Sequence, residues 1–158
     1  MQRCENPVRS SVYHTACSGV GNFKSLLVWQ RAFAFGLRVT RATEAFPRSE
    51  RFGLTAQLRR AAVSVPSNIA EGSRRSGNGE LLYFLGVARG SMGELECQLQ
   101  FARELNYLTT ENWAVLDREA QEISRMLAKL IRYLRLDQAG GRRDQKGASR
   151  PRSPTPNQ

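Results

Sequence analysis

The residues of this chain that could do chemistry are concentrated in the stretch GLTAQLRRAAVSVPSNIAEG, which runs from Gly53 to Gly72. Paired arginines interrupt an apolar row there that recurs every three or four residues, and another arginine pair follows the stretch. Guanidinium groups contact phosphates, and each contact adds salt-sensitive affinity without reading a base sequence. Helical projection places these side chains outward or at the flanks of the apolar row. The candidate nucleic-acid-binding residues are therefore Arg59, Arg60, Arg74, Arg75 and Arg89.

An equally simple interpretation is a solvated face on which these arginines pair with nearby glutamates. Glu71 is such a partner for Arg74 or Arg75, although a carboxylate could in principle act as a base. Most aromatic residues fall on the apolar rows, so the pattern indicates no stacking platform of the kind that dedicated single-strand readers use.

Pro66 marks a second polar cluster in the same stretch. Inside a helix it removes one backbone donor and crowds the carbonyl group four residues earlier. Short polar side chains beside it can bond the backbone atoms that a kink frees. The pattern predicts a kinked core helix with local hydrogen bonds, in which the kink residues are Pro66, Asn68 and Glu71.

The sequence contains no constellation that predicts catalysis. It has no P-loop and no GxGxxG after a strand. The one histidine, His14, lies in a segment expected to be disordered, which removes the usual general base. Glu94 and Glu96 lack the Glu-x-x-His partners of di-iron bundles. We expect no enzyme activity, no metal and no cofactor.

Charge favours a polyanionic partner. The 158 residues carry a formal net charge of +10, and residues 23–136 alone hold 17 Lys and Arg against 11 Asp and Glu. A basic folded part is typical of proteins that bind RNA, DNA or an acidic protein. Arginine-rich composition can also reflect a GC-rich genome, so charge does not decide the function.

Cysteine usage and hydropathy indicate the compartment. The three cysteines, Cys4, Cys17 and Cys97, form no CxxC pair and leave an odd thiol, which argues for a reducing environment. No apolar run approaches the roughly 18 residues that span a bilayer, and the N-terminus has no uninterrupted apolar segment. We expect a cytoplasmic protein that does not enter a membrane.

Four amphipathic helices account for the folded part. The predicted ranges are about 26–45, a second helix capped by Ser49 that ends near 72–75, a third over 80–107 and a fourth from about 110 onward. Asn78 is a candidate cap for the third helix, and Thr109 or Thr110 for the fourth. Each helix carries apolar residues that step by three and four, as a bundle requires.

The third helix carries a second row nearly opposite its apolar one. This row consists of Gly86, Gly90, Gly93 and Cys97, and lies roughly 120–180° away at 100° per residue. A helical glycine is up to about 1 kcal/mol less favourable than alanine, so the row needs a reason. Small residues let another backbone approach closely, which predicts a close-packing or oligomer face. The alternative is that another helix of the same chain fills the row.

The fold predicted from these patterns is all-α, an antiparallel up-and-down four-helix bundle with disordered tails. The expected division is a disordered segment 1–22, a bundle 23–136 and a disordered basic tail 137–158, whose Gly, Pro, Ser and Arg cannot bury a core.

Three segments resemble one bacterial family, the small bundle proteins encoded in intervening sequences of large-subunit ribosomal RNA genes. The segments are LLVWQRA, FPRSERFGLTAQLRRAAVSVPSNIAEGSRR and FLGVARGSMGELECQL. The resemblance implies a noncatalytic homopentamer with a central channel. The accessory protein of diversity-generating retroelements, which is similar in fold but more remote, is basic and binds nucleic acid together with a reverse transcriptase.

These observations favour a nonenzymatic homo-oligomeric module that binds RNA or DNA through arginines on its second and third helices. The alternative is a protein–protein scaffold whose basic surface docks an acidic partner, such as a reverse transcriptase or a ribosome-associated factor.

Overall fold

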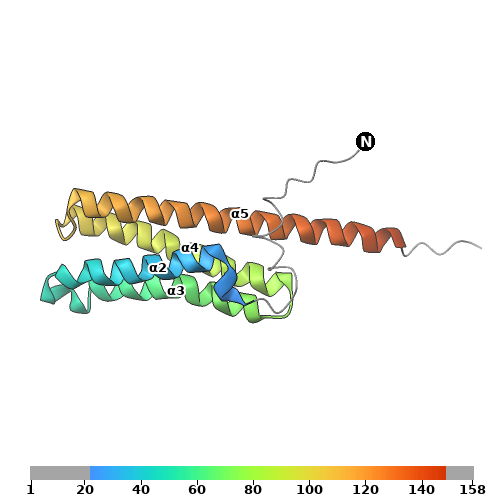
Figure 1. The fold of residues 1–158 in the computed structure, drawn as a ribbon, viewed down its shortest axis with the longest axis horizontal. Helices are drawn as coiled ribbons and strands as arrows, with labels where there is room; N and C mark the ends of the chain where they lie inside the picture. Colours follow the sequence, from blue (N-terminus) through green and yellow to red (C-terminus); the bar gives the residue numbers. More distant parts are fainter. Residues whose placement is uncertain (1–21, 149–158) are drawn as a thin grey trace, which may run out of the picture.

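The computed structural model describes residues 22–148 of the chain, with side chains as far as residue 139. Figure 1 shows long helices that run alongside one another. Within the described residues there is no β-strand. The α-helices are α2 (Leu27–Ala42), α3 (Leu54–Arg74), α4 (Asn78–Glu104) and α5 (Thr110–Ala148), with short 3-10 helices η2 (Phe23–Ser25), η3 (Thr43–Ala45) and η4 (Arg48–Arg51).

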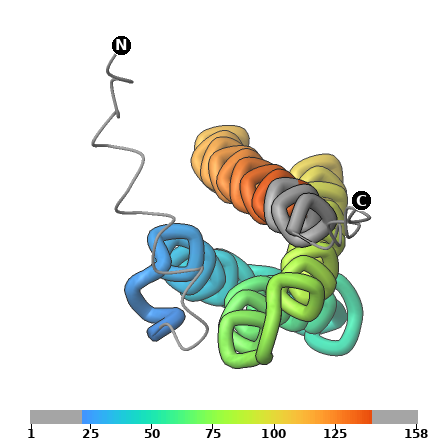
Figure 2. Tube along the Cα trace, turned by 90° about the vertical axis from the view of Figure 1, so that its right-hand side faces the viewer, coloured from blue at the N-terminus to red at the C-terminus, as the bar shows by residue number. Residues whose placement is uncertain are grey.

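The helices form an antiparallel up-and-down bundle, as the sequence predicts. Each helix packs against its neighbour in the sequence, and α5 closes the bundle by packing against α2. Figure 2 shows this arrangement from the end of the bundle. Short connections force consecutive helices to run in opposite directions, so the topology follows from the loop lengths.

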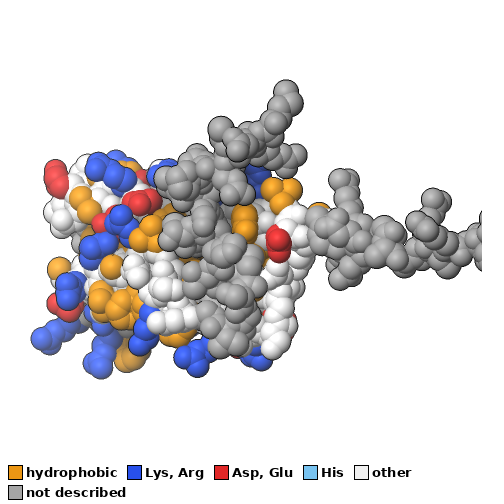
Figure 3. Space-filling view, turned by 45° about the vertical axis from the view of Figure 1, so that its right-hand side comes forward, with side chains coloured by type: hydrophobic (Ala, Val, Ile, Leu, Met, Phe, Trp, Pro, Cys, Tyr) orange, Lys and Arg blue, Asp and Glu red, His pale blue; other side chains and the backbone are white. Residues whose placement is uncertain are grey.

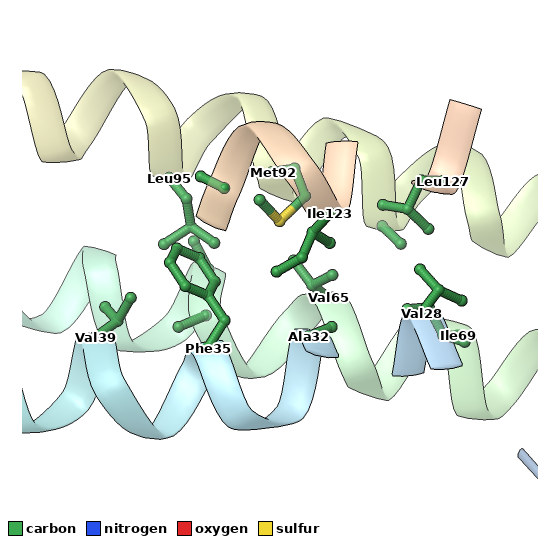
Figure 4. Close-up of a cluster of buried hydrophobic side chains, with 14 of the residues drawn as sticks. Val28, Ala32, Phe35, Val39, Val65, Ile69, Met92, Leu95, Ile123 and Leu127 are labelled. Carbon is green, nitrogen blue, oxygen red and sulfur yellow. The ribbon is translucent and has the colours of Figure 1, made fainter. Parts of the chain in front are cut away.

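The core is made of the apolar rows that the sequence predicts. Phe35, Val65, Met92 and Ile123 represent the four helices in it, and Figure 4 shows these side chains converging between the ribbons. In α4 every predicted core position is buried: Leu81, Leu85, Ala88, Met92, Leu95, Leu99 and Ala102. Burial of these rows supplies the main driving force for folding, at about 25 cal/mol per Å² of apolar surface.

The connection between α2 and α3 differs from the prediction. The sequence places an N-cap at Ser49, but α3 begins at Leu54 with Gly53 in the cap position. Residues 48–51 form the separate turn η4 because Pro47 begins it and the Gly53 N–H closes onto the Glu50 carbonyl oxygen at 3.0 Å. Glu50 supplies the capping oxygen instead, since its Oε2 accepts a hydrogen bond from the Leu54 N–H at 2.9 Å.

Helix α3 continues through Pro66, which is buried inside it. Pro66 has no N–H to donate to the carbonyl oxygen of Ala62, four residues earlier. The Asn68 side chain donates to the carbonyl oxygen of Ser64 at 2.8 Å and to its Oγ at 3.0 Å. Polar side chains therefore bond locally beside the proline, as predicted for Asn68.

The turn between α3 and α4 depends on Gly77, whose φ of 123° is in the region that favours glycine. The prediction of Asn78 as the N-cap of α4 is wrong, because Asn78 is the first residue of the helix and Gly77 holds the cap position. The Asn78 side chain instead donates to Asp137 Oδ2 of α5 at 3.0 Å. At the start of α5, the predicted cap Thr109 accepts a hydrogen bond from the Asn112 N–H.

The predicted tail boundary at residue 137 also needs correction. Helix α5 runs on to Ala148, so residues 137–148 are helical, although the last buried side chain described in it is Leu134. Apolar content decides whether a segment joins a core, but an existing helix adds one hydrogen bond for each further residue without any core.

At the N-terminal end of the described residues, Asn22 Oδ1 accepts a hydrogen bond from the Lys24 N–H. The disorder predicted for residues 1–21 and 149–158 lies outside the described residues.

Candidate nucleic-acid interface

The five arginines predicted as a binding set do not form one cluster. Arg59 and Arg74 lie along the edge of α3 that faces α2, where they contact Thr43 and Phe23. Arg75 lies against Phe84 of α4. Arg89 borders the groove between α4 and α5. These arginines therefore lie on different parts of the bundle surface and do not form one continuous patch.

Arg59 has a structural role. Its Nε donates to Thr43 Oγ1 at 2.8 Å, and its Nη2 donates to the carbonyl oxygen of Thr40 at 3.5 Å. Thr43 is buried, and its own hydroxyl donates to the Thr40 carbonyl oxygen at 2.7 Å. The half-buried guanidinium therefore ties α3 to the C-terminal end of α2. A bound phosphate would have to displace these bonds.

The pair at the end of α3 also has partners within the chain. Arg74 stacks over the Phe23 ring, with its guanidinium carbon 5.3 Å from the ring centroid. Arg75 forms an ion pair with Glu71, as one of the two predicted pairings has it. The hydrogen bond from this guanidinium to Glu71, and then the charge of Glu71, raise the pKa of Arg75 above its usual value. The side chains of Arg74 and Arg75 nevertheless remain exposed, so these contacts reduce their availability to a ligand without burying them.

Arg60 and Arg89 are the members of the predicted set that are exposed and have no ionic partner within the described residues. Arg89 lines a surface groove of about 400 Å³ together with Gly93 and Glu96 of α4 and with Ser124 and Arg125 of α5. Glu96 accepts a hydrogen bond from the Ser124 hydroxyl at 2.6 Å, which fixes its carboxylate between the two helices.

The structure adds three arginines that the sequence interpretation missed. Arg41, Arg48 and Arg51 are exposed around the α2–α3 corner, by which we mean residues 41–53. Within the described residues none of the three has an ion-pair partner. Figure 3 shows Lys and Arg side chains gathered at the end of the bundle where this corner lies. A sequence signal existed, since residues 38–60 hold six arginines against two glutamates.

Glu50, one of those two glutamates, has hydrogen-bond partners within the chain. Besides capping α3, Glu50 accepts a hydrogen bond through Oε1 from the Tyr107 hydroxyl at 3.3 Å. Burial, and then the charge of Glu50, raise the pKa of Tyr107. The Tyr107 ring also packs against Phe46, with 5.4 Å between the ring centroids. The α2–α3 corner is thereby fixed to the α4–α5 connection, and the Glu50 charge is partly satisfied by these donors.

The glycine row of α4 faces outward in the single chain. Gly86, Gly90, Gly93 and Cys97 are all exposed, and a Cβ added to any of the glycines would meet no described atom within 4 Å. The alternative that another helix of the same chain fills the row is therefore wrong for the described residues. The large apolar side chains of Tyr83 and Phe101 flank this row, and they are 68% and 60% exposed. We call this surface the α4 face.

A second apolar surface lies between α2 and α3. It is a groove of about 290 Å³ bordered by Phe33 and Leu37 of α2 and by Val63 of α3. The Phe33 ring stacks on Trp29, and Phe23 continues the groove toward Arg74. The described residues thus present two separate apolar surfaces on different helices.

Among the described residues there is no group of three or more His, Cys, Asp and Glu side chains placed to hold a metal ion. None of the described helices combines the length and apolar character needed to cross a membrane.

Comparison with known proteins identifies relatives of this bundle. The sequence model of the 23S rRNA-intervening sequence protein family matches residues 24–129. A crystal structure from Bacteroides thetaiotaomicron, of a protein with unknown function from the S23 ribosomal protein family, is similar in fold with a TM-score of 0.61. The two chains are 20% identical, and the similarity covers 66% of this chain and 98% of that one. At this identity the likeness concerns the fold alone. No curated protein matches the sequence.

Proposed function

Because the chain belongs to the 23S rRNA-intervening sequence protein family, we propose that it is a nonenzymatic, homo-oligomeric accessory module that binds RNA or DNA in the cytoplasm. The binding surface is the basic end of the bundle, with Arg41, Arg48 and Arg51 at the α2–α3 corner and Arg60 on α3 beyond it. Compared with the predicted set, this surface leaves out the arginines that already have partners within the chain and adds the corner arginines that have none.

The observation that supports this proposal is the concentration of exposed arginines without an ion-pair partner at the α2–α3 corner. Arg31 and Arg38 are paired with Glu122 and Glu119 of α5, at 3.8 and 2.7 Å. Arg41, Arg48 and Arg51 have no such partner in the described residues, and all three lie within residues 41–51. Unpaired guanidinium groups that are gathered at one end form an electrostatic footprint for phosphates.

Binding of structured RNA by the purified protein tests the proposal. We expect retention of a fluorescent RNA hairpin at low ionic strength and a linear fall of log K with log salt concentration. Duplex DNA of the same length, measured in parallel, separates a general polyanion binder from an RNA binder. No retention of either nucleic acid at low ionic strength would overturn the proposal.

The proposal of a homo-oligomer is based on the α4 face. Its glycine row opens to the surface of the single chain, and the flanking Tyr83 and Phe101 leave much of their rings exposed. An exposed apolar face on a helix that already buries its opposite side is typical of a subunit interface. The groove between α2 and α3 is a different apolar surface. Pairing of two different surfaces is the arrangement that closes subunits into rings, which is compatible with a pentamer.

Native mass spectrometry or light scattering tests the assembly. We expect a discrete multiple of the 17.8 kDa chain, with a fivefold mass for the pentamer. A monomer at all concentrations would remove the reason for the glycine row.

A second candidate function is a scaffold that docks an acidic protein, such as a reverse transcriptase or a ribosome-associated factor. The specific observation in its favour is that Arg59 and Arg74 lie near the two ends of the apolar α2–α3 groove. An amphipathic helix with acidic ends would match that pattern. An interaction that survives nuclease treatment, and that a charge reversal at Arg74 weakens, distinguishes this function from nucleic-acid binding.

A further inference from the structure

Phe52 is the most exposed large apolar side chain among the described residues, with 87% of its surface accessible. It lies in the α2–α3 corner between η4 and the Gly53 cap of α3. An exposed aromatic ring contributes almost nothing to the core, so packing does not explain it. It lies in the same corner as the unpaired arginines, and the Arg51 guanidinium is positioned over its ring.

The corner holds this ring in place. The Gly53 N–H donates to the Glu50 carbonyl oxygen at 3.0 Å, and the Glu50 side chain caps the Leu54 N–H. A Cβ on Gly53 would lie 2.5 Å from Glu50 Oε2, so a larger residue here would displace the carboxylate from its position at the helix end. The hydrogen bond from Tyr107 anchors the same carboxylate from the α4–α5 connection. Phe52 therefore lies on a turn that these hydrogen bonds hold in place.

The ring also has a cationic neighbour. The Arg51 guanidinium carbon lies 5.4 Å from the Phe52 ring centroid, and Arg48 is exposed one turn earlier in η4. Aromatic rings stack on the face of any unpaired base, and arginines beside them contact the adjoining phosphates. A paired base inside a duplex offers no free face to such a ring.

We propose that Phe52 stacks on an unpaired base of the bound nucleic acid, while Arg48 and Arg51 contact the phosphates that flank that base. This inference rests on the proposed nucleic-acid binding and names its substrate class as looped or single-stranded nucleic acid. It departs from the sequence interpretation that stacking platforms are absent, because Phe52 lies outside the apolar rows.

The test compares Phe52→Ala and Phe52→Trp with the intact chain on three probes: an unstructured oligoribonucleotide, its DNA counterpart and a blunt RNA duplex of equal length. We expect Phe52→Ala to weaken binding of both unpaired probes by about fivefold or more, in line with the stacking contribution of one base. Binding of the duplex and the salt slope should stay unchanged, because no phosphate contact is removed. Phe52→Trp should retain binding and show fluorescence quenching by the unpaired probes.

Leu136→Ala is the matched control, because Leu136 is 64% exposed on α5 at the other end of the bundle. It should bind every probe as the intact chain does. If the intact chain binds and Phe52→Ala binds the unpaired probes equally well, the stacking role is wrong while the proposed function stands. If the intact chain binds no probe, the proposed function itself fails. A changed native mass for Phe52→Ala would assign the ring to a subunit contact and would overturn the inference.

Discussion

Gly36 of α2 lies directly against the carbonyl oxygen of Ala62 in α3: a Cβ built on the glycine would be 3.1 Å from that oxygen. The same oxygen lacks its helical donor, because Pro66 stands four residues later and has no N–H. The buried proline and the glycine therefore belong to one helix–helix contact, in which α2 approaches closely where the hydrogen-bond ladder of α3 is interrupted.

Gly36→Ala tests this contact. Alanine would gain up to about 1 kcal/mol from helix propensity at an open site. Here the added methyl group meets a main-chain oxygen that cannot rotate away, and overpacking of this kind typically destabilises by about 1–3 kcal/mol. We expect a net loss in the free energy of unfolding, measured by urea denaturation. Gly79→Ala, where a Cβ meets nothing within 4 Å, is the control that should lose no stability. A Gly36→Ala chain as stable as the control would contradict the contact.

Gly90→Leu tests the α4 face. In the single chain no described atom lies within 4 Å of a Cβ at Gly90, so the leucine should leave the helical content and the folding of the subunit intact. We expect it to block close approach of a second subunit and to lower the native mass to that of the monomer. Arg118→Leu places the same side chain at an exposed position of α5, away from the glycine row, and should keep the assembled mass. An assembled Gly90→Leu protein would show that the row lies outside the interface.

Tyr107 predicts a pH dependence of stability. Its pKa is raised above the ordinary value of 10.0 in the folded chain, first by burial and then by Glu50. Above about pH 10 the unfolded chain loses this proton while the folded chain still holds it, so the contribution to stability is complete below that pH and falls as the pH rises. Tyr107→Phe should therefore show a smaller loss of stability between pH 9 and pH 11 in denaturation curves. Equal losses in both proteins would contradict this role.

The four helices and their buried rows could be predicted from the sequence because periodicity reports which side of a helix faces a core. The apolar row from Leu81 to Ala102 is an example, since every one of its members is buried. The local pairing of Glu71 with Arg75 could also be predicted from the sequence, because residues four apart are neighbours on a helix.

The partners of residues far apart in the sequence could not be predicted in this way. Arg59 is tied to Thr43 and Arg74 to Phe23 by the packing of α3 on its neighbours, which periodicity does not specify. The cap at Glu50 was missed because a carboxylate four residues before the bonded N–H replaces the usual side chain at the cap position. The continuation of α5 past residue 136 gives no signal in the sequence, because the residues there have few apolar side chains and no apolar periodicity.

The most direct measurement of the central claim is the salt dependence of RNA binding in two variants that lose the same charge. In one, Arg41, Arg48 and Arg51 become glutamine; in the other, Lys129, Arg132 and Arg135, which are exposed on α5, become glutamine. Each lost phosphate contact should reduce the slope of log K against log salt by about 0.7–0.9. We predict a reduction of about two contacts or more for the corner variant and a near-wild-type slope for the α5 variant. Equal slopes in the two variants would contradict binding at the α2–α3 corner.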